Sequence, residues 1–429
     1  MRTTEVSTEQ LQADLARLRE SYRQYKDMGL NLNISRGLPC SEQLDLNAEM
    51  FHVLDENNYT AEDGTDCRNY GVMYGLPECI RLFSQLLDIP EEHIILGGES
   101  SLNFMYDQIL RIYTFGTLGE KPWGQQAQEQ KLKWLCPVPG YDCHFNLTEA
   151  LGFEMINIPL LETGPDMDLI ERLVSEDPTI KGIWCVPQYS NPTGVVYSDE
   201  TVERLAKLKT AANDFRIVWD NAYAVHHLYR KRVVKDILKA ASAYGLEDRI
   251  LYFFSTAKIT FPGSGVCLMA SGGKTIAETR QQLKLQIFSH DKLNQLRHVK
   301  YLKTPERIHE HMEKIAQILR PRFDLVDRLL TENRLYEDLY TWYKPDGGYF
   351  ITADSYAGCA AEILARVEAA GVKVATAAST FPYHRDPQDT NIRLAPTYPP
   401  MEELETAIRL FCICANLVGI EKVLKEREN

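Results

Sequence analysis

Short runs of apolar residues recur between residues 94 and 270, and each is bounded by polar or glycine-rich segments. The runs are Ile94–Leu96, Lys131–Cys136, Glu154–Leu161, Gly182–Val186, Ile217–Trp219, Ile250–Phe254 and Gly265–Ala270. Such runs are typical of strands that are buried on both faces, and here they alternate with helical segments such as 199–213. The pattern predicts an α/β fold with a mostly parallel sheet that helices cover on both faces.

The two ends of the chain follow a different pattern. Residues 7–28 carry an apolar stripe at helical spacing, and Ser7 with Gln10 resembles a capping box at its start. The C-terminal part reads as helices 306–332, 359–370 and 401–425 with the strands Tyr349–Ala353, Val372–Ala375 and Asn391–Ala395 between them. We therefore expect a large domain of residues 51–304 and a smaller, discontinuous α+β domain of residues 1–50 and 305–429.

The composition and charge of the chain argue against several classes of function. Of the 429 residues, 44% are hydrophobic and 25% are charged, which is ordinary for a soluble globular protein. The net charge of -13 argues against a nucleic-acid surface. No apolar run approaches the about 20 residues of a membrane span, no signal peptide begins the chain, and no Gly-x-Gly-x-x-Gly supports a dinucleotide site. The ten scattered cysteines show no zinc spacing, so we expect no metal and a cytoplasmic protein with reduced thiols.

Polar side chains follow three of the predicted strands at the point where each strand ends. Asp220 and Tyr223 follow the first strand, Ser255 and Lys258 follow the second, and the turn of residues 191–194 follows the third. In parallel sheets, ligands bind outside the carboxyl ends of the strands, and burial there can make a lysine nucleophilic. A single lysine after a strand is usually solvated and a single aspartate usually caps a helix, so only the whole set of residues indicates a site.

The sequences Asn191-Pro192-Thr193-Gly194, Asp220-x-x-Tyr223 and Ser255-x-x-Lys258 together resemble the class I aminotransferases of fold type I, which depend on pyridoxal 5'-phosphate (PLP). Ser-Thr-Ala-Lys, Asp-Asn-Ala-Tyr and an early Ser-Arg-Gly are most similar to the bacterial aspartate aminotransferase branch called Ic, which is related to the aminotransferase domain of MocR-type regulators. The similarity runs from about Leu32 to the C-terminal helix. It implies the fold type I architecture, a PLP cofactor and a homodimer.

The resemblance implies a role for each residue of the set. Lys258 would form the Schiff base with PLP and then transfer the proton between substrate and cofactor. Asp220 would pair with the pyridine nitrogen and keep it protonated. Asn191 and Tyr223 would hydrogen-bond the O3′ oxygen of the ring, and Ser255 would donate to the phosphate.

Other segments resemble further parts of the cofactor site. Ser100 and Ser101 follow two glycines before a helix that starts near Leu102, where free N–H groups attract anions. They match the family's phosphate cup, although ordinary N-capping would give the same pattern. Tyr141 matches the aromatic residue that stacks on the PLP ring. Tyr70 matches a tyrosine that reaches the partner subunit's cofactor phosphate; a tyrosine in a glycine-rich loop is the plainer interpretation.

Three residues, together with Asn191, match the substrate-binding end of the family's site. Arg393 lies in a short apolar strand and would form a bidentate pair with the substrate α-carboxylate. Gly37 matches a glycine that lies against the substrate. Arg36 is either the second cation that an aspartate-type enzyme needs or a surface residue in a turn. Lys284, His290, Lys292 and Arg297 offer other cations for a dicarboxylate, or are simply solvated.

The chain departs from the family's pattern at two places. Cys143 stands where the Ic branch often has arginine, so any role of that arginine is absent or moved. Gly265 stands where many class I enzymes have an arginine that pairs with the phosphate. The Ic branch shares the small residue, which leaves the phosphate charge to other groups.

From these features we expect an aminotransferase that moves the amino group of L-aspartate or L-glutamate to a 2-oxo acid such as 2-oxoglutarate, by a ping-pong mechanism. Its partners are small molecules and a second copy of the chain, with no nucleic acid and no membrane. The first alternative is another PLP enzyme of this fold, such as an aromatic aminotransferase or a C–S lyase. The second is a PLP-sensing domain of a regulator, which the acidic charge and the short segment of about 30 residues before the similarity disfavour.

Overall fold

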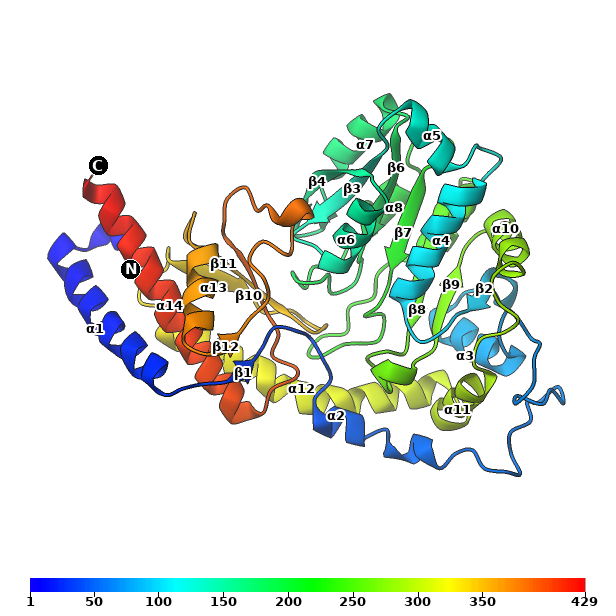
Figure 1. Cartoon of the computed structure of the whole chain (residues 1–429), viewed down its shortest axis with the longest axis horizontal. Coiled ribbons are helices and arrows are strands. Elements are labelled where there is room, and N and C mark those ends of the chain that lie inside the picture. Colours follow the sequence, from blue (N-terminus) through cyan, green and yellow to red (C-terminus); the bar gives the residue numbers. More distant parts are fainter. Residues whose placement is uncertain (429) are drawn as a thin grey trace.

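An eight-stranded sheet forms the centre of the larger part of the molecule (Figure 1). The computed structural model describes residues 1–428. The strands, in spatial order, are β2 (Ile94–Leu96), β9 (Cys267–Ala270), β8 (Ile250–Ser255), β7 (Arg216–Asp220), β6 (Ile180–Cys185), β3 (Lys133–Val138), β4 (Glu154–Leu161) and β5 (Gly164–Pro165). Strands β8, β7, β6, β3 and β4 are mutually parallel, whereas β9 is antiparallel to its neighbours and β5 to β4. The predicted mostly parallel sheet is confirmed.

Helices cover both faces of this sheet, and the apolar residues of each strand alternate between two cores. In β7, Ile217 and Trp219 belong to one core and Val218 belongs to the other. The first core includes residues of α3 (Pro77–Leu87), α7 (Met167–Glu176), α8 (Asp199–Ala206) and α9 (Ile237–Ser242). The second includes residues of α4 (Ser101–Phe115), α5 (Trp123–Glu129), α6 (Asp142–Ala150) and α10 (Gly273–Leu283). Continuous apolar runs in the sequence therefore reflect burial on both sides.

One predicted helix is too long. The helix expected over residues 199–213 ends at Ala206, because the backbone leaves the helical conformation at Lys207. The chain then turns so that the Ala211 amide donates to the Val174 carbonyl at 2.7 Å. Packing against α7 thus overrides the helical periodicity of the sequence.

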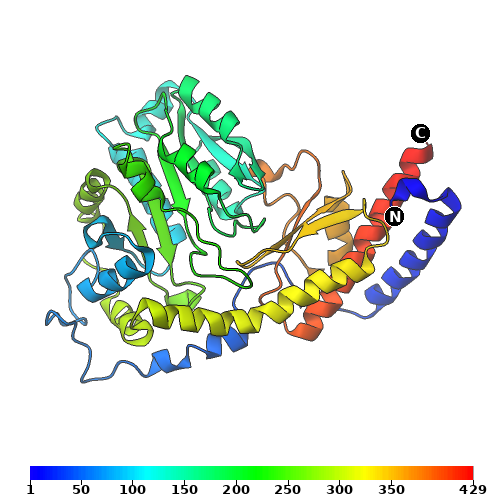
Figure 2. The ribbon, with the colours of Figure 1, turned by 180° about the vertical axis from the view of Figure 1, so that it is seen from behind.

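The smaller part of the molecule combines both ends of the chain (Figures 1 and 2). Strands β10 (Tyr340–Tyr343), β11 (Ile351–Ser355) and β13 (Asn391–Leu394) form an antiparallel sheet, and β1 (Leu32–Asn33) pairs in parallel with β12 (Val372–Lys373). Helix α1 (Thr8–Asp27) packs against α14 (Met401–Glu428), which also contacts α13 (Ala360–Ala369). The Ser7 hydroxyl accepts from the Gln10 amide, as the predicted cap requires.

Helix α12 (Pro305–Asn333) runs along the molecule from the larger to the smaller part (Figure 2). The other helices are α2 (Ser41–Asp45) and α11 (Lys292–Leu302), with the 3-10 helices η1 (Thr3–Glu5), η2 (Ala48–Phe51), η3 (Glu91–His93), η4 (Glu247–Arg249), η5 (Pro262–Ser264) and η6 (Pro382–His384). The pairing of β1 with β12 and of α1 with α14 supports a discontinuous small domain. Its boundaries at residues 50 and 305 stay a prediction.

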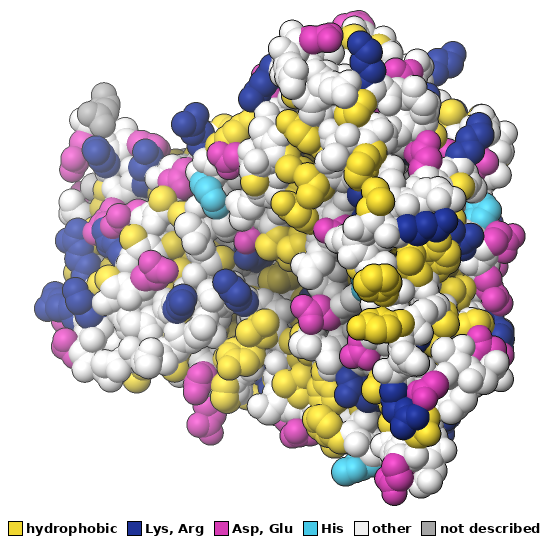
Figure 3. Space-filling view, turned by 45° about the vertical axis from the view of Figure 1, so that its right-hand side comes forward, with side chains coloured by type: hydrophobic (Ala, Val, Ile, Leu, Met, Phe, Trp, Pro, Cys, Tyr) yellow, Lys and Arg dark blue, Asp and Glu magenta, His cyan; other side chains and the backbone are white. Residues whose placement is uncertain are grey.

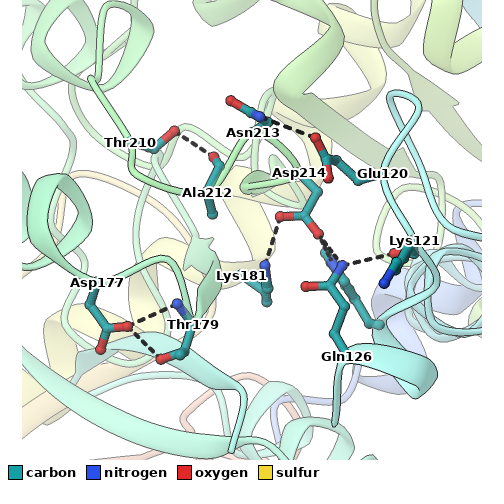
Figure 4. A network of polar contacts seen from close by, with 11 residues as sticks. Glu120, Lys121, Gln126, Asp177, Thr179, Lys181, Thr210, Ala212, Asn213 and Asp214 are labelled. Atoms are coloured by element: carbon teal, nitrogen blue, oxygen red, sulfur yellow. Dashed lines mark hydrogen bonds and ion pairs between the residues drawn. The ribbon is translucent and has the colours of Figure 1, made fainter. Parts of the chain in front are cut away.

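A buried ion pair joins the amino-terminal ends of the central strands (Figure 4). Lys181 Nζ lies 2.8 Å from Asp214 Oδ1, and the two side chains are only 5% and 3% exposed. Asp214 Oδ2 also accepts from Trp123 Nε1 at 2.9 Å and from Gln126 Nε2 at 2.8 Å. A buried pair is tolerated when such bonds satisfy its remaining atoms. The network fixes α5 to the edge of the sheet opposite to the candidate site.

Candidate active site

The structure brings most of the residues singled out in the sequence to one cavity at the carboxyl ends of β3, β6, β7 and β8, but not the four alternative cations Lys284, His290, Lys292 and Arg297. The cavity has a volume of about 490 Å³. The predicted residues that line it are Arg36, Gly37, Ser100, Ser101, Tyr141, Asn191, Asp220, Tyr223, Ser255, Lys258 and Arg393. They converge because parallel strands end at the same edge of the sheet. Tyr70 also lies outside the cavity.

Lys258 lies in the turn that follows β8, with its side chain half-buried in the cavity wall. Burial lowers the pKa of its ammonium group, and the nearby negative charge of Asp220 opposes this shift only partly. The Lys258 Nζ lies 5.2 Å from the ring centroid of Tyr223 and 5.7 Å from that of Tyr349. Gln43 Nε2 donates to the Lys258 carbonyl at 3.1 Å, so the N-terminal segment helps to hold this turn. A lysine in this setting can act as a neutral amine.

Asp220 is the last residue of β7 and is 3% exposed. Its Oδ2 lies 3.1 Å from His144 Nε2, while its Oδ1 is buried without a partner among the described residues. The His144 ring stacks on Trp184 with a centroid distance of 4.2 Å and an interplanar angle of 7°. A buried carboxylate oxygen without a partner is costly, so this oxygen marks a position where a ligand donor fits.

The sequence interpretation missed His144. The available signal was its place three residues after Tyr141, in the first turn of α6, which begins where β3 delivers the chain to the cavity. Tyr141 is the N-cap of that helix, and its ring lies edge-on to the His144 ring at 4.9 Å. Burial raises the pKa of the Tyr141 phenol, which stays protonated as a neutral wall of the cavity.

Asn191 and Tyr223 face the cavity from neighbouring strand ends. Asn191 is 6% exposed, and its Oδ1 has no partner among the described residues. Tyr223 is 2% exposed and its ring stacks on Tyr349 with a centroid distance of 6.2 Å. Burial raises the pKa of the Tyr223 phenol. The two side chains therefore present uncharged polar groups beside Lys258.

The amino-terminal end of α4 faces the cavity. Ser100 is the N-cap of this helix, but its hydroxyl makes no capping bond, and Ser101 is the first helical residue. The N–H groups of the first turn and both hydroxyls are therefore free to bind an anion. Ser255, the last residue of β8, lines the same cavity. At Gly265 a Cβ atom would come within 2.9 Å of the Glu99 carbonyl oxygen, so this backbone has no room for an arginine side chain.

The opposite end of the cavity carries positive charge. Arg393 on β13 has a side chain that is 8% exposed, and its Nη1 lies 3.1 Å from Asp142 Oδ1. Arg36 and Lys373 line the cavity as exposed residues. Gly37 lies against Phe350, because a Cβ at Gly37 would come within 2.6 Å of Phe350 Cζ. The glycine thus makes room for the ring that lies beneath Arg393.

Tyr70 lies outside the cavity lining and is 79% exposed. Its ring contacts that of Phe288 at a centroid distance of 5.6 Å. Lys292 donates to the neighbouring Asn69 carbonyl, which holds the loop of residues 69–77 against α11. Within one subunit Tyr70 has no place in the site, and its expected role in a partner's site stays a prediction.

Residues 1–428 contain neither a cluster of metal ligands nor a membrane-spanning helix. No group of three or more His, Cys, Asp and Glu side chains could hold a metal ion. None of the helices in this part of the chain is long and apolar enough to cross a membrane.

Comparison with known proteins gives a consistent result. The sequence model of the family described as aspartate amino-transferase matches residues 6–427. A Mycolicibacterium smegmatis protein named provisionally as an aminotransferase is 42% identical over 412 residues, which make up 95% of each chain. An aspartate aminotransferase from Corynebacterium glutamicum is 39% identical over 406 residues, 94% of this chain and 93% of the relative. The crystal structure of an aspartate transaminase from Corynebacterium glutamicum matches with a TM-score of 0.95 and 38% identity, covering 98% of this chain and 99% of that one.

Proposed function

The chain belongs to the aspartate amino-transferase family, and from this we propose that it is a PLP-dependent enzyme that moves the α-amino group of L-aspartate or L-glutamate to a 2-oxo acid such as 2-oxoglutarate. The observation that carries the proposal is the arrangement around Lys258. Two buried oxygens that have no partner within residues 1–428, Asp220 Oδ1 and Asn191 Oδ1, belong to residues that line the cavity with this lysine.

These residues fit PLP. The free Asp220 oxygen suits a protonated pyridine nitrogen, and Asn191 with Tyr223 suits the phenolic oxygen of the ring. Tyr141 supplies an aromatic wall, and the free N–H groups of α4 with Ser100, Ser101 and Ser255 suit a phosphate. When bound, PLP supplies an electron sink that stabilises a carbanion at the substrate α-carbon.

The protein's own groups then divide the work. His144 holds the Asp220 carboxyl group in one orientation through the bond of 3.1 Å. Lys258 is the amine that attaches the cofactor and that accepts and returns the α-carbon proton at Nζ, since burial lowers its pKa. Arg393 binds the α-carboxylate and orients the α-carbon toward Lys258. The aromatic side chains of Tyr141 and Tyr223 exclude water from this position.

The charge of the cavity supports a dicarboxylic substrate. Arg36, Lys373 and Arg393 line it together with Asp142, and among the described residues no ion pair occupies the Arg36 or Lys373 side chain. The two carboxylates of such a substrate would each find a cation in this cavity. Arg36 is our choice for the second carboxylate, because it is adjacent to Gly37 on the substrate side of the cavity.

A homodimer is part of the proposal. Tyr70, Leu285 and Phe288 are 79%, 75% and 75% exposed, and Tyr106 and Leu110 of α4 add to this apolar surface. Gln286 donates to Asp107 at 2.9 Å, which places the segment around residue 286 beside α4. Figure 3 shows hydrophobic side chains gathered on the larger part of the molecule. A second copy covering this surface would bury it and bring Tyr70 toward the partner subunit's site.

A cytoplasmic location is also proposed. The ten cysteines are all free thiols, and nine of them are buried. Free thiols suit a reducing compartment.

The test is direct product analysis. The purified protein loaded with PLP is incubated with L-aspartate and 2-oxoglutarate, and oxaloacetate and L-glutamate are quantified. We expect both products in equal amounts with the wild type. Lys258→Ala should lower turnover by about 10⁴-fold or more, whereas the exposed-lysine control Lys207→Ala should leave it unchanged. Wild-type-like turnover in Lys258→Ala would sink the assignment.

A further inference from the structure

Arg393 is held from two directions before any substrate arrives. It lies on β13 opposite Thr352 of β11, so the rigid sheet of the smaller part fixes its Cα position. Its guanidinium carbon lies 5.0 Å from the ring centroid of Phe350, within the range of a cation–π contact. Its Nη1 lies 3.1 Å from Asp142 Oδ1, which belongs to α6 of the larger part.

The remaining edge of the guanidinium is free. Arg393 Nε is buried and has no partner among the described residues. A guanidinium offers a carboxylate two bidentate edges, Nη1 with Nη2 and Nε with Nη2. Asp142 occupies the first through Nη1, which leaves the second edge, with its unsatisfied Nε–H, for a ligand.

Asp142 has an alternative role that must be weighed. It is the first residue of α6, where a carboxylate is favoured by the helix dipole. That role needs no particular partner and predicts an effect on stability alone. The contact with Arg393 is different, because it crosses from one part of the molecule to the other and lies in the lining of the cavity.

We propose that Asp142 is a positioning residue that holds Arg393 by Nη1 and leaves the Nε–Nη2 edge for the substrate α-carboxylate. In the same proposal, Asp142 lowers the affinity of Arg393 for that carboxylate. The inference rests on the proposed function, in which Arg393 binds that carboxylate. Asp142 fixes the plane of the guanidinium, so that the α-carbon meets Lys258 in one orientation. Its negative charge also weakens the hold on the anionic ligand, which favours release of product.

The experiment measures carboxylate binding to the PLP-loaded protein by isothermal titration calorimetry. The probes are succinate and butyrate. Succinate has two carboxylates, whereas butyrate has a single carboxylate on a chain with the same number of carbons. The variants are Asp142→Asn, which keeps an oxygen acceptor for Nη1 but loses the charge, and Asp142→Ala, which loses both. Glu149→Gln removes one negative charge from the exposed far end of the same helix and is the matched control.

We expect the two variants to move in opposite directions. Asp142→Asn should lower the Kd of both probes by about 3- to 10-fold, because the charge that competes for Arg393 is gone. Asp142→Ala should raise both by about 10-fold, because Arg393 loses its fixed orientation. Glu149→Gln should change neither. Equal shifts in the same direction for Asn and Ala would reduce Asp142 to a simple charge and overturn the positioning role.

If the Asp142 variants lowered the melting temperature without changing the Kd of either probe, Asp142 would only stabilise the start of α6, and the positioning role would be overturned. The proposed function is judged separately from the same data. If the wild-type protein bound butyrate as tightly as succinate, the proposed specificity for dicarboxylates would be contradicted. The change in the Kd of butyrate in the Asp142 variants would still test the positioning role of Asp142. A structure with bound succinate should show the carboxylate on Nε and Nη2.

Discussion

His144 Nε2 lies 3.1 Å from Asp220 Oδ2, and the His144 imidazole stacks on the Trp184 indole with the rings 4.2 Å apart. The pair leaves Asp220 Oδ1 without a partner in the described part of the chain, beside the cavity that Asp220 lines. A rigid stack on one side of the carboxylate and an open oxygen on the other direct its charge toward one position.

The first prediction concerns this pair. Asp220→Asn should lower kcat by at least about 100-fold, equal to about 2.7 kcal/mol, because a neutral amide cannot keep a ring nitrogen protonated. His144→Gln keeps a donor at a similar position and should lower kcat by about 10-fold. Steady-state kinetics check both, with far-UV circular dichroism to confirm folding. If Asp220→Asn kept full kcat, the carboxylate could not be the partner of the cofactor ring.

The second prediction concerns the Gly37–Phe350 contact. Gly37→Ala would place its Cβ 2.6 Å from Phe350 Cζ, so the ring beneath Arg393 must shift. We expect KM to rise by about 10-fold for every amino-acid substrate, since a displaced Arg393 loses the α-carboxylate that all of them share. Gly273→Ala is the control, because nothing lies within 4 Å of its added Cβ and its φ is not positive. An effect confined to one substrate would place Gly37 against the side chain of the substrate instead.

The third prediction follows from buried neutral histidines. Burial lowers the pKa of His226 to about 3 and that of His298 to about 4. The unfolded chain titrates near pH 6.5, so below that pH it binds more protons than the folded state does. The free energy of unfolding should therefore fall as the pH drops from 6.5 toward 4, by up to about 1.4 kcal/mol per pH unit for each histidine.

Urea titrations of the apoprotein at pH 7 and pH 5 measure this loss. His226→Gln should flatten the dependence, and the exposed-site control His52→Gln should not. An unchanged slope in His226→Gln would mean that this imidazole does not stay neutral in the folded protein.

The fourth prediction concerns the ion pair at the opposite edge of the sheet. Lys181→Met leaves Asp214 buried next to an uncharged side chain, and we expect a loss of about 3–5 kcal/mol in the free energy of unfolding. Adding Asp214→Leu should recover only part of it, because Trp123 Nε1 and Gln126 Nε2 then lose their acceptor. Chemical denaturation of the single and double variants tests the coupling. Additive losses would show that the two charges do not interact.

The fifth prediction concerns assembly. Phe288→Asp places a charge on the apolar surface next to Tyr70, and we expect the proposed dimer to dissociate or weaken at micromolar concentration. Sedimentation velocity of the wild type and the variant measures this. The exposed Tyr244, distant in sequence from this surface, supplies the control Tyr244→Asp, which should stay dimeric. If the wild type were monomeric, Tyr70 could not contribute to the active site of a partner subunit.

The site residues that follow the strands could be predicted from the sequence. The residues that contact and orient them could not. Asp220 and Lys258 were predictable because each follows an apolar run, and parallel strands end at one edge. His144, Asp142 and Phe350 were not, because their partners lie 76, 251 and 43 positions away and depend on how whole elements pack. Likewise the end of α8 at Ala206 depends on contacts made by the following turn.

The most direct test of the account is the half-reaction with single amino acids. The PLP-loaded protein is mixed with an excess of one amino acid in a stopped-flow spectrophotometer, and the shift from the band of bound PLP to that of its aminated form is followed. The account predicts a fast shift with L-aspartate and L-glutamate and little with L-alanine, L-tyrosine or L-kynurenine. A fast shift with an aromatic amino acid alone, or no shift with any amino acid despite bound cofactor, would contradict it.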